Sequence, residues 1–327
     1  MKYILIVIVV ILVLIIFEIY RELHTFKETN VEINSEKLKG LYSDKKIVFL
    51  SDLHNQVYGT HNVDLIRAVR DARPDLILIG GDFLVGKQGV SYRPAIRLVR
   101  QLVKIAPVYY ANGNHEQRMK EKPKKYNSPL YVSYKNDLLN LGVHLLENRR
   151  ELLPLDDVWM TISGYEISLR HYGMKAKTTL KTEDLYDKVG NPSGDFNILL
   201  AHNPTFMETY FDWGADLVLS GHLHGGIVRL PFIGGVIAPG FIFNPKYDAG
   251  IFTSSDATVE KNTSRYVVNA SKDSAIGFVT RGIGAHTIKI RLFNPAELVT
   301  IVLKANDRNY EDMVGDEYIN ALNNDEI

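Results

Sequence analysis

The chain of 327 residues contains no cysteine. It therefore forms no disulfide, offers no thiolate metal ligand and has no cysteine nucleophile, so any metal chemistry rests on His, Asp, Glu and Asn side chains. It also lacks an excess of either charge, because 38 Lys and Arg residues balance 38 Asp and Glu residues. A nucleic-acid-binding domain usually carries a clear basic surplus, so no nucleic-acid binding is indicated.

The first twenty residues differ from the rest of the chain. Residues 3–17 form an uninterrupted apolar run, and a helix over residues 3–20 would be about 27 Å long at ~1.5 Å per residue, close to the ~30 Å hydrocarbon core of a bilayer. A cleaved signal peptide is the alternative, but the run is bulky and β-branched and no Ala-x-Ala-like site follows it. We predict a transmembrane anchor at residues 1–20. The flanking charges are nearly balanced, so the positive-inside rule does not fix its orientation.

After the anchor, the chain alternates short buried strands with helices. Residues 21–44 are mostly polar and are predicted to be a linker that ends in an edge strand. The pattern then predicts strand 46–50, helix 65–72, strand 74–81, helix 92–104 and strand 107–111, with later strands at 196–200 and 217–219. This βαβ succession indicates an α/β domain with a parallel sheet, which we place at residues 45–305. The polar tail 306–327 is assigned no function.

Metal-capable side chains collect where these strands end, which is where an open α/β sheet gathers its reactive groups. The five strand ends carry Asp52 and His54, then Asp82, then Asn114, His115 and Glu116, then His202, and finally His222 and His224. Alternation along a strand predicts that Asp52 shares a face with His54, and His222 with His224. Each motif alone is more often a turn, a helix cap or a hydrogen-bonded histidine. The five in succession indicate a site.

In this order and spacing the motifs resemble those of the calcineurin-like metallophosphoesterases: Asp-x-His, Gly-Asp, Gly-Asn-His-Glu, a lone His, and Gly-His-x-His. Residues 225–231, 280–284 and 293–297 extend the resemblance to a membrane-associated bacterial branch, that of the YkuE and YaeI phosphodiesterases. The resemblance covers about residues 30–305 and implies a four-layer αββα sandwich. Two departures are visible: Ile227 replaces a common glutamine, and residues 253–274 look like inserted polar sequence.

The resemblance also implies a dinuclear metal site. One ion would be held by Asp52, His54 and His224, the other by Asn114, His202 and His222, with Asp82 bridging both. These ligand types suit Mn, Fe or Zn better than Ca. A hydroxide bridging the ions would attack a phosphodiester or pyrophosphate bond, and His115 would stabilise the transition state or protonate the leaving oxygen. Glu116 is expected to support a helix N-terminus.

The substrate is less determined than the chemistry. The protein phosphatases of this superfamily carry an Asp-Arg-Gly element after Gly-Asp, and residues 81–87 lack it. The resemblance and the anchor favour a phosphodiester or a lipid-linked pyrophosphate, with hydrolysis of UDP-2,3-diacylglucosamine as one alternative and a non-catalytic, metal-binding membrane scaffold as another. Arg118, Arg229 and Arg281 either meet substrate phosphate or form surface ion pairs. We expect a single-pass protein of a bacterial cell membrane with an extracytoplasmic catalytic domain; the oligomeric state stays open.

Overall fold

The structure is a computed structural model that describes residues 2–126, 128–173, 179–230, 233–238, 242–254, 257–285 and 289–305. The predicted tail 306–327 lies outside these residues. The α-helices are α1 (Lys2–His24), α2 (Val63–Ala72), α3 (Arg93–Leu102), α4 (Asn114–Glu121), α5 (Pro123–Tyr126), α6 (Ser128–Asn140), α7 (Thr182–Val189) and α8 (Met207–Trp213). Short 3₁₀ helices cover Glu36–Leu38, Thr60–Asn62, Leu169–His171 and Pro204–Phe206.

Eighteen strands are present among the described residues. The first nine are β1 (Phe26–Ser35), β2 (Lys45–Leu50), β3 (Leu76–Ile79), β4 (Val108–Tyr110), β5 (His144–Leu145), β6 (Arg149–Leu155), β7 (Val158–Tyr165), β8 (Phe196–Ala201) and β9 (Leu217–Ser220). The others are β10 (Arg229–Leu230), β11 (Gly234–Gly235), β12 (Ile237–Ala238), β13 (Ile242–Phe243), β14 (Gly250–Thr253), β15 (Ala257–Asn262), β16 (Arg265–Ala270), β17 (Ile276–Val279) and β18 (Ala296–Ala305).

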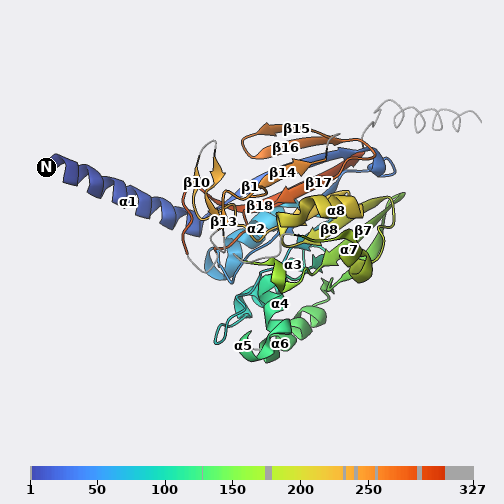
Figure 1. The fold of residues 1–327 in the computed structure, drawn as a ribbon, viewed down its shortest axis with the longest axis horizontal. Helices are drawn as coiled ribbons and strands as arrows, with labels where there is room; N and C mark the ends of the chain where they lie inside the picture. Colours follow the sequence, from blue (N-terminus) through green and yellow to red (C-terminus); the bar gives the residue numbers. More distant parts are fainter. Residues whose placement is uncertain are drawn as a thin grey trace, which may run out of the picture.

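Two large sheets form the centre of the molecule (Figure 1). One has the order β15-β16-β1-β18-β2-β3-β4-β5 and the other has the order β14-β17-β9-β8-β7-β6. Strands β2 to β5 are parallel, and so are β7, β8, β9 and β17. Parallel strands direct their carboxyl ends to one edge, so the predicted clustering of strand ends has a structural basis.

Three apolar clusters hold the layers together. One lies between the sheets and includes Phe49, Leu78 and Phe278. A second packs β2 to β4 against α2, α3 and α6, and a third packs the other sheet against α7 and α8. All four residues of β3 are buried because a helix layer covers one face and the second sheet covers the other. The predicted αββα sandwich is confirmed.

Strand β1 corrects the predicted edge strand in residues 21–44. It is an interior strand that pairs in parallel with β16 on one side and β18 on the other. Both neighbours come from the last fifth of the described chain, so nothing local in the sequence reveals them. The polar residues that suggested an edge instead face solvent on one side of the sheet, where Glu32 pairs with Arg265 and Lys304.

Residues 253–274, which looked like inserted sequence, contribute regular structure. They include the hairpin β15–β16, which extends the larger sheet beyond β1. These residues therefore widen the larger sheet at its β15 edge.

Helix α1 projects from the body beside β10 and β13 (Figure 1). It is the one helix among the described residues that is long and apolar enough to cross a membrane, and its apolar window is not buried in the fold. Its last turn, however, is attached. The Glu22 carboxylate accepts a hydrogen bond from the Asn294 amide at 2.9 Å, and Gln56 Nε2 donates to the Leu23 carbonyl at 2.9 Å.

Candidate metal centre

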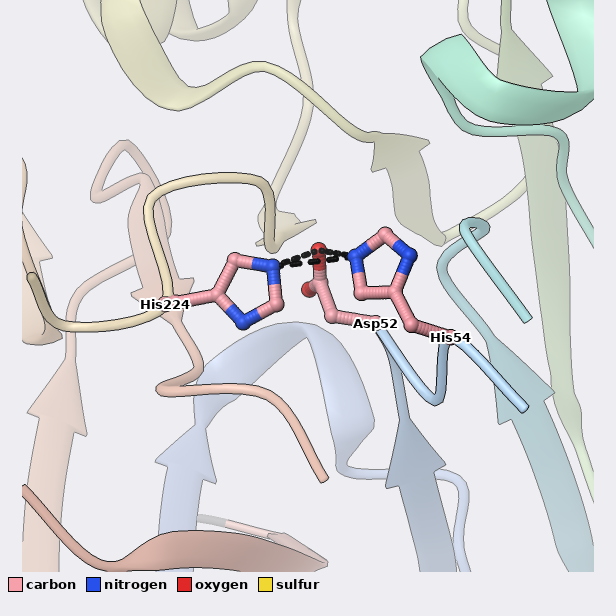
Figure 2. Close-up of side chains that lie close together, drawn as sticks. All are labelled: Asp52, His54 and His224. Carbon is pink, nitrogen blue, oxygen red and sulfur yellow. Dashed lines mark hydrogen bonds and ion pairs between the residues drawn. The ribbon is translucent and has the colours of Figure 1, made fainter. Parts of the chain in front are cut away.

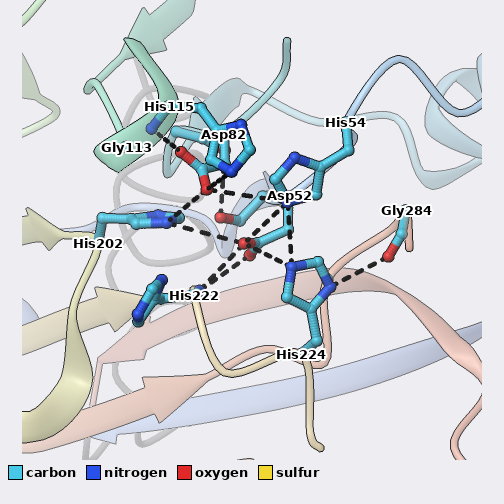
Figure 3. A network of polar contacts seen from close by, with 12 residues as sticks. Asp52, His54, Asp82, Gly113, His115, His202, His222, His224 and Gly284 are labelled. Atoms are coloured by element: carbon cyan, nitrogen blue, oxygen red, sulfur yellow. Dashed lines mark hydrogen bonds and ion pairs between the residues drawn. The ribbon is translucent and has the colours of Figure 1, made fainter. Parts of the chain in front are cut away.

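The predicted ligands meet at the carboxyl edge of both sheets, in the loops that follow β2, β3, β4, β8 and β9 (Figure 3). All of them are buried. The reason we predicted for their pairing is wrong, because β2 and β9 end before the paired residues. Asp52, His54, His222 and His224 instead have φ values of 57°, 45°, 68° and 53°, in the left-handed region. Such backbone costs roughly 1–2 kcal/mol per non-glycine residue, so packing elsewhere must hold these loops in place.

The first cluster consists of Asp52, His54 and His224 (Figure 2). The Nε2 atoms of the two histidines lie 3.1 Å apart, and His224 Nε2 lies 3.3 Å from Asp52 Oδ1. His54 Nε2 is 4.0 Å from the same oxygen. Two imidazole nitrogens and one carboxylate oxygen thus converge on one point, as ligands of a divalent ion do.

The second cluster consists of Asp82, His202 and His222, whose ligating atoms lie within 4.8 Å of one another. His202 Nε2 is 3.2 Å from Asp82 Oδ2. Asn114 begins α4 beside this cluster, and its Oδ1 is buried with no hydrogen-bond partner among the described residues. An amide oxygen left without a donor in a buried site is costly unless a cation or water satisfies it, so Asn114 fits the ligand role.

Asp82 lies between the two clusters. Its Oδ2 is 3.2 Å from His202 Nε2 in one cluster and 3.8 Å from His54 Nε2 in the other. Burial by itself would raise the pKa of Asp82, but the imidazoles of His115, His202 and His54 hold it well below its usual range. Burial raises the pKa of Asp52 to about 6, against the opposing effect of His202. Asp52 also reaches the second cluster, since its Oδ1 lies 3.7 Å from His202 Nε2, but Asp82 has the lower pKa of the two carboxylates.

Backbone carbonyls orient two of the histidines. His202 Nδ1 lies 2.7 Å from the Gly80 carbonyl, and His224 Nδ1 lies 3.2 Å from the Gly284 carbonyl. A carbonyl only accepts hydrogen bonds, so each Nδ1 carries a proton and each Nε2 is the ring atom left to bind an ion, on His202 once its second proton is displaced. This is the tautomer that a metal ligand needs.

His115 is held in the opposite way. Its Nδ1 accepts a hydrogen bond from the Gly86 amide at 3.0 Å, and Arg118 Nη2 lies 2.5 Å from the same atom. Both neighbours can only donate, so the proton of the neutral ring sits on Nε2. That Nε2 faces Asp82 Oδ2 at 3.8 Å. The geometry therefore separates His115, which points a donor into the site, from the histidines that point lone pairs into it.

Residues 45–226 match the family described as calcineurin-like phosphoesterase. This range is more than half of the chain and contains every predicted ligand together with His115. The chain belongs to this family. The predicted resemblance is confirmed, and the chain is a metal-dependent hydrolase of phosphoric esters.

Three relatives illustrate the range of similar proteins. The phosphoesterase is 25% identical over 298 residues to uncharacterized metallophosphoesterase YkuE of Bacillus subtilis, covering 88% of each chain. It is 27% identical over 218 residues to phosphodiesterase YaeI of Escherichia coli, covering 63% of this chain and 69% of that protein. It is also 27% identical over 291 residues to a transmembrane protein with metallophosphoesterase domain of Bos taurus, covering 85% of this chain and 57% of that protein.

Glu116 has a larger part in the phosphoesterase than the predicted helix-end support. It is fully buried, and its carboxylate accepts the Gly113 amide at 3.1 Å, which caps α4. It also accepts the amides of Asp82, Phe83 and Leu84 at 2.9, 3.0 and 3.4 Å and the Tyr110 hydroxyl at 2.8 Å. One carboxylate thus ties the loop after β3 to the start of α4. Burial and the charge of Asp82 raise the pKa of Glu116 to about 7.

Glycines allow these loops to approach one another. A Cβ on Gly113 would lie 2.2 Å from Asp82 Oδ1, and a Cβ on Gly221 would lie 2.1 Å from Asp52 Oδ2. No side chain fits at either distance, so Gly-Asp, Gly-Asn-His and Gly-His-x-His require their glycines for close packing of the ligand loops.

Arg291 and Asn294 hold the loop after β17 through contacts that the sequence did not predict. Arg291 is buried, and its guanidinium donates to the carbonyls of Arg281, Gly282, Gly284 and Asn294 at distances of 2.5 to 3.1 Å. These residues form the loop after β17, which packs against Asp52. The Asn294 amide group in turn donates to the carbonyls of His224 and Gly226 at 2.6 and 2.5 Å. Residues 280–284 and 293–297 belong to the predicted resemblance, but only the fold reveals these contacts.

The other predicted candidates have local roles. Arg118 contacts His115, as described above, and Arg229 pairs with Asp248 at 2.7 Å. Arg281 lines a cleft described below.

Proposed function

We propose that this phosphoesterase is a membrane-anchored hydrolase that cleaves phosphodiester or pyrophosphate bonds with two divalent ions. The observation that carries the proposal is the convergence of two His and Asp clusters on either side of Asp82. Asp52, His54 and His224 would hold one ion. Asn114, His202 and His222 would hold the other, and Asp82 would bridge them.

The donors at this site fit such ions. Imidazole, carboxylate and amide oxygens together suit Mn, Fe or Zn, and the buried Asn114 oxygen is a position that an ion would satisfy. When bound, two such ions polarise a phosphoryl oxygen and lower the pKa of a coordinated water. Two divalent ions also bring four positive charges against the two of Asp52 and Asp82, and the surplus attracts a phosphate group.

The role proposed for His115 follows from its tautomer. With Nδ1 occupied by the Gly86 amide and Arg118, the ring offers Nε2–H to the charge that develops on the phosphoryl group. A further proton on Nδ1 would meet two donors, which disfavours the doubly protonated ring that a general acid requires. This supports transition-state stabilisation rather than protonation of the leaving oxygen.

One contact favours a lipid-linked substrate. The Asn294 backbone amide donates to Glu22 in the last turn of α1, and its side-chain amide donates to the His224 carbonyl. If α1 spans a bilayer, the metal edge lies at the membrane surface, where a lipid-borne diester or pyrophosphate reaches it. Hydrolysis of a UDP-2,3-diacylglucosamine type of substrate is the second candidate within this class. The non-catalytic scaffold is disfavoured because the ligand set and His115 are all present.

The location is proposed on the same basis. We expect α1 to anchor the enzyme in a bacterial cell membrane with the catalytic domain extracytoplasmic. The chain has no cysteine, so a cysteine introduced at exposed Trp159 would be the single thiol. Labelling of that thiol by an impermeant maleimide in intact cells supports this location, whereas labelling only after lysis contradicts it.

The hydrolase proposal is tested on the full chain in lipid nanodiscs, because β1 begins two residues after α1 and truncation endangers the sheet. Bound metal is measured by mass spectrometry, and turnover of bis(p-nitrophenyl) phosphate is measured with Mn²⁺ added. Asp82→Asn should lose both ions or nearly all activity, while Asp248→Asn, outside the ligand set, should keep both. A folded protein with two bound ions and no turnover of phosphodiesters, pyrophosphates or lipid nucleotides would refute the proposal and favour the scaffold.

A further inference from the structure

A second concave site lies beside the metal centre. It is a cleft of about 690 Å³, and its cationic lining residues are Lys27, Arg229, Lys246, Lys261 and Arg281. Among the described residues that line the cleft, Asp248 is the one that carries a carboxylate. The charge of its walls is therefore strongly positive, although the chain as a whole is neutral.

Most of this positive charge is not compensated. Arg229 pairs with Asp248 at 2.7 Å, and Lys246 pairs with exposed Glu208 at 2.5 Å. Within the described residues, no carboxylate lies within ion-pair distance of the side chains of Lys27, Lys261 or Arg281. In this part of the chain Arg281 Nε is also buried without a hydrogen-bond partner. The cleft is thus suited to an anion that brings oxygen acceptors.

The cleft lies next to the end of the apolar helix. Lys27 follows the last residue of α1 by three positions, and Phe293, whose neighbour Asn294 holds Glu22, lines the same cleft. Figure 1 shows α1 leaving the body beside β10, which supplies Arg229. A bilayer around α1 would therefore place the cleft at the level of lipid headgroups.

Exposed apolar side chains line the cleft together with the cationic ones. Ile233 and Phe293 are 61% and 54% exposed, and Leu230 is 38% exposed. A soluble phosphate ion would gain nothing from contact with these apolar side chains, whereas a membrane interface accommodates apolar side chains and cations together.

We propose that the cleft binds the anionic headgroup of a phospholipid in the membrane that holds α1. The cations attract the lipid phosphate, as basic juxtamembrane residues do, and the apolar residues enter the interface. The inference rests on the proposed membrane anchoring. Because Gly282 packs against Asp52 and Gly225 packs against Arg281, the cleft shares a wall with the metal centre. A bound headgroup would turn the metal edge toward the bilayer.

The absence of cysteine allows a site-specific test. Ile233→Cys is labelled with a fluorophore in the full chain and reconstituted in nanodiscs of brominated phosphatidylcholine, with or without brominated phosphatidylglycerol. The matched control is a label at Val132→Cys, which is 53% exposed on α6, away from α1 in Figure 1. We expect quenching at position 233 to rise with the phosphatidylglycerol fraction and quenching at position 132 to stay low.

Charge reversal distinguishes headgroup binding from simple proximity. Lys246→Glu combined with Lys261→Glu should raise the phosphatidylglycerol fraction needed for half-maximal quenching by roughly threefold or more. Lys104→Glu, an exposed lysine outside the cleft, should not change it. Equal quenching with and without phosphatidylglycerol overturns the proposal. Loss of the difference when free glycerol phosphate is added overturns it as well, because the cleft would then bind soluble phosphate.

Hydrolysis of a soluble diester in the same discs separates the two proposals. Turnover without headgroup selectivity means that only the cleft inference fails. Selective quenching without turnover by the metal-loaded protein means that only the hydrolase proposal fails. A chain that does not enter nanodiscs through α1 contradicts the anchoring on which the cleft inference depends.

Discussion

The buried carboxylate of Glu116 offers the sharpest test of how the ligand loops are held. Glu116→Gln replaces one oxygen by an NH₂ group that can only donate. In the less costly orientation this group faces the amides of Asp82 and Gly113, which now lie 2.9 and 3.1 Å from the carboxylate. A buried donor left without an acceptor costs ~1–3 kcal/mol, so two cost roughly 2–6 kcal/mol.

This loss of folding free energy should appear as a lower melting temperature of the Glu116→Gln variant. At ~2–4 °C per kcal/mol for a large domain, the variant should unfold roughly 5 °C or more below the unsubstituted enzyme. Thermal unfolding is followed by circular dichroism at pH 8, above the pKa of about 7 of Glu116, where the carboxylate is ionised. The matched control is Glu121→Gln on the same helix, which is exposed and accepts one hydrogen bond, from Gln117. If both variants melt within about 1 °C of the parent, the reasoning about Glu116 is wrong.

Three further predictions concern the site. His115→Ala should keep both ions and lose roughly 10²–10³ in kcat, as removal of a positioned transition-state donor does; loss of metal equal to that of Asp82→Asn would contradict its separate role. Burial alone would lower the pKa of His202, but Asp82 and Asp52 raise it to about 10. An ion that binds His202 must therefore displace a proton, and the metal affinity should rise between about pH 7 and pH 10. The heat of metal binding, measured by calorimetry in two buffers of different ionisation enthalpy, should differ because the buffer takes up the released proton. Equal heats in the two buffers would exclude proton release. Arg291→Met should lower both the melting temperature and metal occupancy, whereas exposed Arg149→Met should change neither; equal behaviour would exclude the loop-holding role of Arg291.

The His202 prediction also fixes the sign of a stability effect. The folded-state pKa is raised above the ordinary value, so the stabilisation from protonated His202 is present below about pH 6.5 and is lost as pH rises through about 10. The ion-free enzyme should therefore become less stable over this range. Added metal should reverse the trend, because the ion replaces the proton between the carboxylates.

Much of the fold could be predicted because its signals are local. The apolar runs of β3 and β8 and the apolar periodicity of α3 indicate which residues are buried. The βαβ order indicates that successive strands pair in parallel. The metal ligands could be predicted from the motifs, because few types of side chain bind metals. Strand β1 could not be predicted, because its neighbours β16 and β18 lie more than 200 residues away in the sequence and its polar face resembles that of an edge.

The sequence by itself determined the chemistry of this enzyme, because residue type decides which atoms can bind an ion and the glycines beside Asp82 and His222 admit close backbone. The tertiary structure decided how those atoms are presented. Left-handed backbone in the loops, rather than alternation along a strand, orients the pairs Asp52–His54 and His222–His224. The Gly80 carbonyl and the Gly86 amide determine which ring nitrogen of His202 and of His115 binds a proton. Arg291 holds the loop after β17 in place. The tertiary structure also decided that the end of α1 rests against Asn294 beside the metal ligands. Such contacts join distant segments, and only packing of the whole chain brings them together.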